Sequence, residues 1–164
     1  TDTLLINKLD NDAFADANVS FSLSETLRKC ILFLQEEWER KEIDVEADFE
    51  EFFYIGNERL LSQLFMNLIE NAVKYSREGG KIAVRIAEDD KKLTVTIADN
   101  GIGMSKETLS RMYDKYFRGD KSRSVPGNGL GLSIVKRIAD VTGAEVSAVS
   151  ALGKGTEFTV ILKK

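Results

Sequence analysis

The run from Gln63 to Ser76 constrains the fold most, because its apolar residues recur at the spacing of an amphipathic helix. The side expected to be buried, which starts just before this run, comprises Leu61, Leu64, Phe65, Leu68, Ile69, Ala72 and Val73. The opposite side carries a polar stripe of Gln63, Asn67, Glu70, Asn71 and Lys74. A helix with one apolar side must pack on another layer, so this run predicts a layered domain.

The polar stripe has an unusual composition, because it holds two amides, Asn67 and Asn71, one helical turn apart. A plain solvated face tends to mix Glu and Lys instead. Amide oxygens are neutral acceptors suited to a hard cation such as Mg²⁺, and the neighbouring Lys74 can reach a phosphate. On this segment alone, a solvated helix face is an equally good interpretation.

The composition of the whole chain narrows the classes of function. Its 164 residues fit one domain, and a net charge of -4 argues against a general nucleic-acid binder. The chain has no histidine and a single cysteine, Cys30, which excludes serine–histidine and cysteine–histidine catalysis, histidine metal sites and an internal disulfide. Without a membrane-spanning run or a signal peptide, a cytoplasmic location is expected for this chain.

Local patterns along the rest of the chain predict alternating helices and strands. Ser22 with Glu25 forms a capping-box signal for one helix, and Asn57 can cap the long helix described above. The other expected elements are strands at 43–49, 82–86, 93–97, 146–149 and 156–162, and a helix at 130–141 that Gly143 closes. This order predicts an α+β fold, a two-layer α/β sandwich with helices on one face of a mainly antiparallel sheet.

A second candidate site is the segment from Asp99 to Gly103, where a carboxylate ends an apolar strand and two glycines follow. Glycine lets the backbone turn tightly and approach a ligand closely. A carboxylate at this position can accept a hydrogen bond from an amine such as the exocyclic amino group of adenine. An ordinary Asp-Asn-Gly turn is the alternative.

A third candidate site is Gly127 to Leu132, where three alternate glycines lead into a helix. Free amides at a helix N-terminus can bind an anion, although a plain glycine linker is the alternative. The segment is neither a Rossmann fingerprint nor a Walker A loop, because it follows a loop and has other spacing. Between the last two sites lie the cations Lys106, Arg111, Lys115, Arg118, Lys121 and Arg123.

Taken in order, these motifs resemble the catalytic and ATP-binding domain of the sensor histidine kinases of two-component systems. This is the Bergerat-type fold shared with DNA gyrase B, the chaperone HSP90 and the mismatch-repair protein MutL. The resemblance covers about Phe21 to Lys164 and implies a mixed, mostly antiparallel sheet of about five strands on three helices, with an ATP lid. The matching segments are Gln63–Ser76 (asparagine box), Asp99–Gly103 and Gly127–Leu132 (glycine boxes), Tyr113–Arg118 (phenylalanine box) and Gly153–Phe158.

The resemblance implies that ATP and Mg²⁺ bind at these motifs. Asn71 would be the Mg²⁺ ligand, Asn67 would contact the phosphates or the water on the metal, and Asp99 would read the adenine amino group. The other residues implied in binding are Lys74 and Arg118 for phosphates, Tyr75 near the nucleotide, Thr156 in support of Asp99, Gly101 and Gly103 around adenine, and Gly127, Gly129, Leu130, Gly131 and Leu132 at the lid hinge and phosphates. Asn67, Asn71, Lys74 and Arg118 would serve catalysis.

The chemistry implied is phosphoryl transfer from ATP to a histidine, which depends on positioning and charge stabilisation. Gyrase-type ATPases carry a glutamate, the base that activates water, where this chain has Asn67, and an amide cannot accept that proton. The alternatives are an ATP-hydrolysing domain of the gyrase or MutL class, an anti-sigma-type serine kinase, and a binding module without activity. The role of Glu70 is left open.

The resemblance also predicts domain organisation and partners. Residues 1–16 would be a linker or the tail of a dimerisation helix, residues 17–164 the catalytic and ATP-binding domain, and residues 104–126 the lid. Since the chain contains no histidine, it is expected not to phosphorylate itself. Its partner would be the dimerisation domain of the same kinase, and indirectly a response regulator, but no nucleic acid. The fragment would be monomeric, and the parent a homodimer anchored in the cell membrane.

Overall fold

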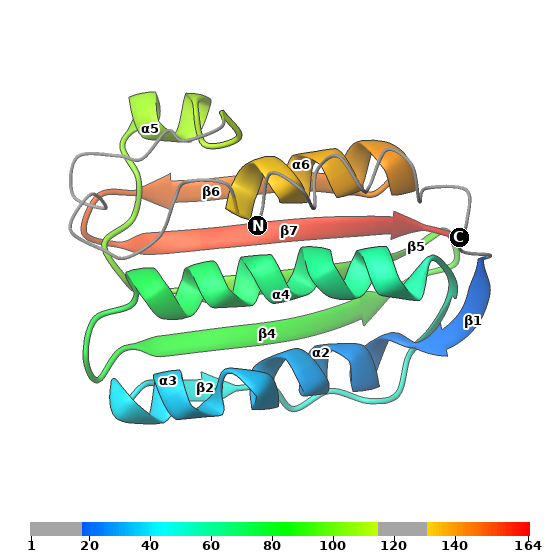
Figure 1. Ribbon diagram of the computed structural model, residues 1–164, viewed down its shortest axis with the longest axis horizontal. Helices are drawn as coiled ribbons and strands as arrows, with labels where there is room; N and C mark the ends of the chain where they lie inside the picture. Colours follow the sequence, from blue (N-terminus) through cyan, green and yellow to red (C-terminus); the bar gives the residue numbers. More distant parts are fainter. Residues whose placement is uncertain (1–17, 115–130) are drawn as a thin grey trace.

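Helix α4 (Glu58–Tyr75) lies along one face of a five-stranded sheet in the computed structural model, which describes residues 18–114 and 131–164 (Figure 1). In order across the sheet, the strands are β2 (Asp44–Glu46), β4 (Lys81–Glu88), β5 (Lys92–Asp99), β7 (Gly155–Lys163) and β6 (Glu145–Ala151). Strands β2 and β4 are parallel, and every other pair is antiparallel. The predicted α+β fold with a mixed, mostly antiparallel sheet is therefore confirmed.

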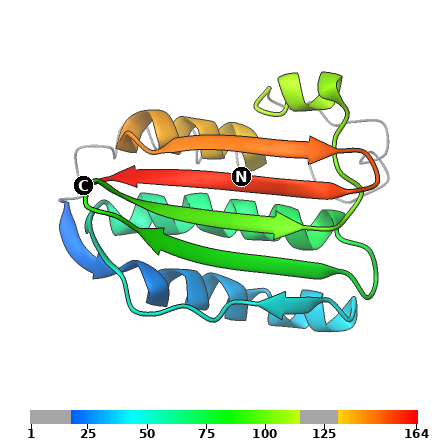
Figure 2. The same ribbon diagram turned by 180° about the vertical axis from the view of Figure 1, so that it is seen from behind.

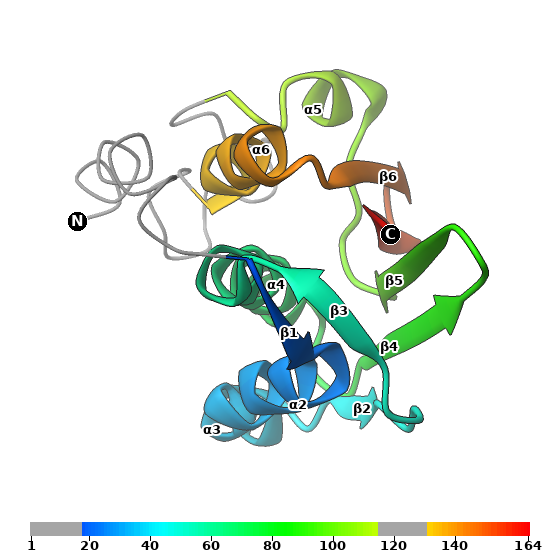
Figure 3. The same cartoon turned by 90° about the vertical axis from the view of Figure 1, so that its right-hand side faces the viewer.

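The larger helices form the second layer, all on the same face of the sheet. Beside α4 these are α2 (Leu23–Phe33) with its short continuation α3 (Gln35–Arg40), and α6 (Gly131–Thr142). The end-on view separates helices from strands, and no helix in the described part of the chain covers the opposite face of the sheet (Figures 2 and 3). The predicted two-layer sandwich is confirmed.

The helix ends predicted from capping residues lie where the sequence indicates. The Ser22 hydroxyl accepts a 3.1 Å hydrogen bond from the amide of Glu25 and begins α2. The Asn57 side chain accepts one of 3.1 Å from the amide of Leu60 and begins α4. At the end of α6, Gly143 adopts a φ of 82°. These local signals suffice because each cap involves residues at most four apart.

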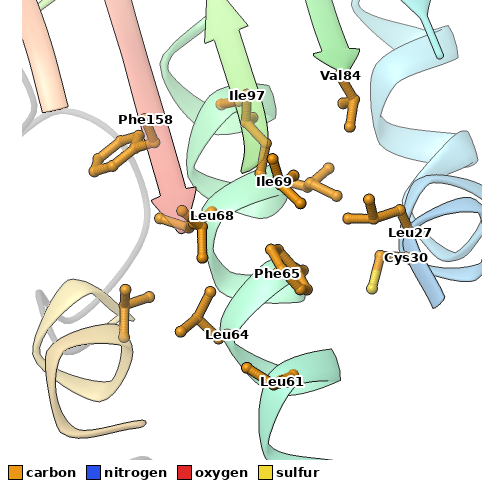
Figure 4. Packing of buried hydrophobic residues seen from close by; sticks show 14 of the residues in the cluster. Leu27, Cys30, Leu61, Leu64, Phe65, Leu68, Ile69, Val84, Ile97 and Phe158 are labelled. Atoms are coloured by element: carbon orange, nitrogen blue, oxygen red, sulfur yellow. The ribbon is translucent and has the colours of Figure 1, made fainter. Parts of the chain in front are cut away.

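The core forms where the apolar side of α4 meets the inner face of the sheet. All seven α4 residues predicted to be buried are at most 4% exposed. Figure 4 shows this side of α4 facing Ile97 and Phe158 of the sheet and Leu27 and Cys30 of α2. Cys30 is a core residue, as predicted, and burial raises the pKa of its thiol to about 11.

The strand predicted at 43–49 is wrong in its extent, because β2 has only three residues. Beyond β2, the backbone pairs with α2 rather than with the sheet. The Ser24 hydroxyl donates to the carbonyl of Glu50 at 2.7 Å and accepts from the amide of Phe52 at 2.8 Å. The alternating apolar residues in this stretch therefore reflect packing on the core rather than a long strand.

A second, two-stranded sheet was not predicted. It pairs β1 (Val19–Ser22) with β3 (Phe53–Gly56) in antiparallel orientation. Phe21 and Tyr54 hold it together with an edge-to-face ring contact at 6.2 Å between centroids. Its strands are too short for their apolar pattern to be recognised in the sequence.

The predicted lid and linker fall largely outside the described residues. Of the predicted lid, 104–126, the structure describes residues 104–114, which include the short helix α5 (Lys106–Ser110). The predicted linker, 1–16, lies outside the described ranges. Within residues 18–114 and 131–164, no helix combines the length and the apolar character needed to cross a membrane.

Replacing Leu68 with alanine should lower the free energy of unfolding by about 2–5 kcal/mol, because this fully buried side chain fills the space between α4 and the sheet. Denaturant unfolding measures the change. Phe33→Ala is the matched control, since Phe33 is 76% exposed and its loss should change the unfolding free energy by less than about 0.5 kcal/mol. Equal effects of the two substitutions would contradict the core described here.

Candidate functional site

Most of the predicted site residues that the structure describes gather at one end of the sandwich. The C-terminal end of α4, the end of β5 and the turn between β6 and β7 meet there, at the left of Figure 1. The amide of Ile102 donates to the carbonyl of Tyr75 at 3.1 Å, and the amide of Gly153 donates to the carbonyl of Ile102 at 2.8 Å. The segment after Asp99 is thus held between α4 and the β6–β7 turn.

Two predicted glycines permit this close packing of backbone on backbone. A Cβ atom at Gly101 would lie 2.0 Å from the carbonyl oxygen of Tyr75. Gly103 has a φ of 70°, and a Cβ atom there would lie 2.0 Å from the carbonyl oxygen of Ala151. Any larger residue would push the segment away from its neighbours. Both glycines are therefore required for the backbone packing within the described part of the chain, whether or not a ligand binds.

Asp99 ends β5 as a partly buried carboxylate beside buried Thr156. Its Oδ1 atom accepts a 2.9 Å hydrogen bond from the amide of Gly101, and Asp99 lies opposite Thr156 in the β5–β7 register. Burial raises the pKa of the Asp99 carboxyl, and hydrogen bonds from the backbone amides of Gly101 and Thr156 partly oppose that shift. The result is a hydrogen-bond acceptor held at a fixed position at the end of the sheet.

The two asparagines of the polar stripe differ in their contacts. The Oδ1 atom of Asn67 accepts from the side chain of Gln63 at 2.7 Å, and its Nδ2 atom donates to the carbonyl of Gly131 at 3.3 Å. Asn67 therefore connects α4 to the start of α6. Asn71 is half-buried, and its side chain makes no hydrogen bond with another of the described residues. Of the two asparagines, Asn71 is thus the one whose amide oxygen has no partner among the described residues.

Lys74 pairs with Glu70 on the same helix, with 3.4 Å between its Nζ atom and Oε1 of the carboxylate. The side chains of Lys74 and Glu70 are 37% and 46% exposed, so water screens the pair and its contribution is small. A phosphate carries more charge than one carboxylate and can take the place of Glu70 beside this lysine. Tyr75 follows directly and is half-buried.

Lys41 was missed by the sequence reasoning, although it holds the end of the site helix. Its Nζ atom donates to the carbonyl of Val73 at 2.8 Å and to that of Lys74 at 3.0 Å. Burial, followed by the charge of Arg40, lowers the pKa of this amine. A cation at a helix C-terminus is favourable, and here it also fixes the turn that carries Lys74 and Tyr75. No local pattern signals it, since more than 30 residues separate Lys41 from that turn.

The predicted phosphate-binding residues are only partly described. Gly127, Gly129, Leu130 and Arg118 lie outside the described ranges. Gly131 and Leu132 begin α6, where both are half-buried and Leu132 packs on the core. The roles assigned to all of these residues stay predictions.

A Mg²⁺ site here would have to use oxygen atoms other than those of clustered carboxylates. No group of three or more His, Cys, Asp or Glu side chains comes together in residues 18–114 and 131–164. Mg²⁺ often takes only one or two protein ligands and completes its shell with substrate phosphates and water. The free amide oxygen of Asn71 beside Lys74 fits such a metal–phosphate group.

Comparison with known proteins identifies one family, and the similar proteins include named sensor proteins and sensor kinases. Residues 56–164 match the family of histidine kinase-, DNA gyrase B-, and HSP90-like ATPases. The chain is 37% identical over 161 residues to the heme sensor protein HssS of Staphylococcus saprophyticus, covering 98% of this chain and 35% of that protein. It is 30% identical over 166 residues to the sensor histidine kinase RppB of Synechocystis, covering 99% of this chain and 37% of RppB.

Solved structures agree with this similarity. The mycobacterial sensor histidine kinase MprB matches with a TM-score of 0.77 and 25% identity, over 90% of this chain and 97% of the MprB chain. The present chain spans only about a third of the length of the two relatives above, 35% and 37%. The similarity to those relatives therefore concerns one part of longer proteins.

Substituting Lys41 with methionine should loosen the end of α4 while keeping the fold, because the carbonyls of Val73 and Lys74 lose a charged donor. We expect a loss of about 1–3 kcal/mol in unfolding free energy and faster hydrogen exchange at the amides of Ser76 and Ile102. Lys29→Met, at an exposed position of α2, is the control. Unchanged exchange at both amides in the Lys41 variant would contradict this role.

The raised pKa of Asp99 has a measurable consequence for stability. The native state binds this proton more tightly than the unfolded state, so the contribution of Asp99 to stability should rise as the pH falls from neutral through the raised pKa. Asp99→Asn cannot titrate. Without nucleotide, the unfolding free energy of the wild type minus that of the variant should therefore increase down to about pH 4. A difference that is constant with pH, or that changes in the other direction, would rule out a raised pKa.

Proposed function

Because this chain belongs to the family of histidine kinase-, DNA gyrase B-, and HSP90-like ATPases, we propose that it is the catalytic domain of a sensor histidine kinase. It binds ATP with Mg²⁺ and transfers the γ-phosphoryl group to a histidine on a separate dimerisation domain. The observation that carries this proposal is the position of Asn67, where an ATP-hydrolysing relative would have a glutamate.

Adenine is recognised at the end of β5 in this proposal. The exocyclic amino group of adenine donates to the Asp99 carboxylate, whose other oxygen already accepts from the amide of Gly101. Thr156 lies beside Asp99 and supports it. Partial burial strengthens a hydrogen bond to this carboxylate, because water competes less for the same acceptor.

Phosphates and Mg²⁺ lie along the polar stripe of α4. Asn71 offers its amide oxygen to the metal, and Lys74 leaves Glu70 to pair with phosphate oxygens. The metal would neutralise charge that develops on the phosphates during transfer. Asn67 keeps the start of α6 in place through Gly131, so it holds the stripe and the predicted phosphate loop in one arrangement.

Transfer to an imidazole rather than to water follows from the groups available beside Asn71. Activation of water needs a base, and the amide of Asn67 cannot accept a proton. Glu70 is the nearest carboxylate on the helix, but it pairs with Lys74. An imidazole nitrogen of a partner is itself a nucleophile, so it needs no such base from this domain.

The proposal extends to the organisation of the parent protein. Residues 17–164 form the catalytic domain, residues 104–126 its lid, and residues 1–16 the connection to a dimerisation helix. The parent acts as a membrane-anchored homodimer with this domain in the cytoplasm, and it passes the phosphoryl group on to a response regulator. The similarity to proteins named as sensor histidine kinases supports the kinase part of this arrangement.

A direct test mixes the chain, radiolabelled ATP and Mg²⁺ with a separately prepared dimerisation domain that carries the accepting histidine. The expected result is acid-labile label on the dimerisation domain and none on this chain. Label on this chain, or rapid ATP hydrolysis without transfer, would refute the proposal. Labelling of a serine on a partner would favour the serine kinase alternative.

Asn71→Ala should reduce Mg²⁺-dependent transfer to the dimerisation domain about 100-fold, the upper end of the loss seen when a metal-positioning group is removed. The fold should persist, because Asn71 makes no hydrogen bond with the other described residues. Gln35→Ala removes an exposed amide from α3 and serves as the control. If the Asn71 variant retains transfer at the rate of this control, the metal assignment is wrong.

A further inference from the structure

A small hydrogen-bond network around Ser150 lies directly behind the proposed adenine site, where β6 meets β7. The Ser150 hydroxyl accepts from the amide of Met104 at 2.7 Å and donates to the carbonyl of Gly155 at 3.0 Å. Its oxygen also lies 2.8 Å from the hydroxyl oxygen of Thr156. Ser150 therefore contacts three separate backbone or side-chain groups at once, although it is not one of the predicted site residues.

The protons of this network can be assigned by counting donors and acceptors. A serine hydroxyl has one proton and can accept two hydrogen bonds. The carbonyl of Gly155 can only accept, so it takes the Ser150 proton, and the amide of Met104 can only donate. The remaining lone pair of Ser150 then accepts the proton of the Thr156 hydroxyl. Every group in the network is satisfied by this one arrangement.

This arrangement leaves the Thr156 oxygen with lone pairs only. Thr156 is opposite Asp99 in the register of β5 and β7, so the two side chains are neighbours on the same face of the sheet. A base that contacts this pair meets two acceptors and no donor. An amino group, as in adenine, matches such a surface, whereas the carbonyl oxygen that guanine has at the same ring position is repelled.

We infer that Ser150 is a positioning residue for nucleotide specificity, which selects adenine over guanine by keeping the Thr156 hydroxyl as an acceptor. This inference rests on the proposed function, since it requires a purine nucleotide at Asp99. Ser150 acts through Thr156 and does not itself contact the base. A purely structural role, such as holding Met104, would lower the affinity for both nucleotides alike.

The test measures the dissociation constants of ATP and GTP by calorimetry and compares their ratio between variants. Ser150→Ala frees the Thr156 proton, so the preference for ATP should fall about tenfold, the effect of one modest hydrogen bond. Ser150→Thr keeps the hydroxyl and should retain the ratio within about twofold. Ser147→Ala removes an exposed hydroxyl from the same strand and should leave the ratio unchanged.

A double-mutant cycle separates an effect through Thr156 from an independent one. Thr156→Val removes the acceptor at similar volume and should itself lower the preference for ATP. In that background, Ser150→Ala should change the ratio by less than about twofold, because the group it controls is gone. The inference is wrong if the two effects multiply, if Thr156→Val keeps the wild-type ratio, or if Ser150→Ala weakens ATP and GTP equally.

The same measurements distinguish this inference from the proposed function. A wild-type chain that binds no ATP would overturn both. A wild-type chain that prefers ATP, with variants at Ser150 that keep this preference, would overturn the inference and leave the proposed function standing. Thermal unfolding of each variant, compared with Ser147→Ala, shows whether a change in the ratio accompanies a loss of folded protein.

Discussion

The packing of α4 on the five-stranded sheet is the contact on which the site depends. Because its apolar side is fully buried against Ile97 and Phe158, the polar stripe on the other side has only one orientation. That orientation brings Asn67 within hydrogen-bond distance of Gly131 at the start of α6. A rotation of the helix that moved Asn71 would expose leucine side chains to water, at a cost of roughly 2 kcal/mol for each one. The hydrophobic core therefore positions the groups that would bind the metal and the phosphates.

The C-terminal end of α4 is fixed just as firmly by polar contacts. A helix normally leaves its last four carbonyls without partners inside the helix. Here the carbonyls of Val73 and Lys74 accept from Lys41, and that of Tyr75 accepts from the amide of Ile102. These bonds join the end of α4 to Lys41, which directly follows α3, and to Ile102, which lies in the segment after β5. The corner where adenine and phosphate recognition would meet is thus built from three parts of the chain that hydrogen bonds hold together.

Features that depend on residues close in sequence could be predicted for this molecule, whereas contacts between distant residues could not. The caps at Ser22 and Asn57, the β4–β5 hairpin and the buried side of α4 each depend on residues close in sequence, and each was predicted correctly. The contacts of Lys41 with Val73 and Lys74, and that of Ser150 with Met104, join residues more than 30 positions apart, and nothing in their sequence neighbours indicates them. The end of β2 was also misjudged for this reason, since hydrogen bonds with Ser24 of α2 redirect the chain. Alternation predicts which side chains face the core, but it does not tell whether the backbone between them pairs with a strand.

The site also contains two ionisable groups, Asp99 and Lys41, for which burial disfavours the charged form. Burial raises the pKa of Asp99 and lowers that of Lys41, so for each group the folded protein disfavours the ionised form. Apolar residues at these positions would avoid that cost. Lys41 offsets it through two hydrogen bonds to helix carbonyls, whereas Asp99 receives only backbone amides and keeps capacity to accept more. A partly buried carboxylate whose acceptor capacity is not used within the protein is typical of a binding site rather than of a structural ion pair. In the proposed function, Asp99 is therefore the residue at which stability and ligand recognition would be most directly opposed, and Ser150 and Thr156 would determine which base it accepts.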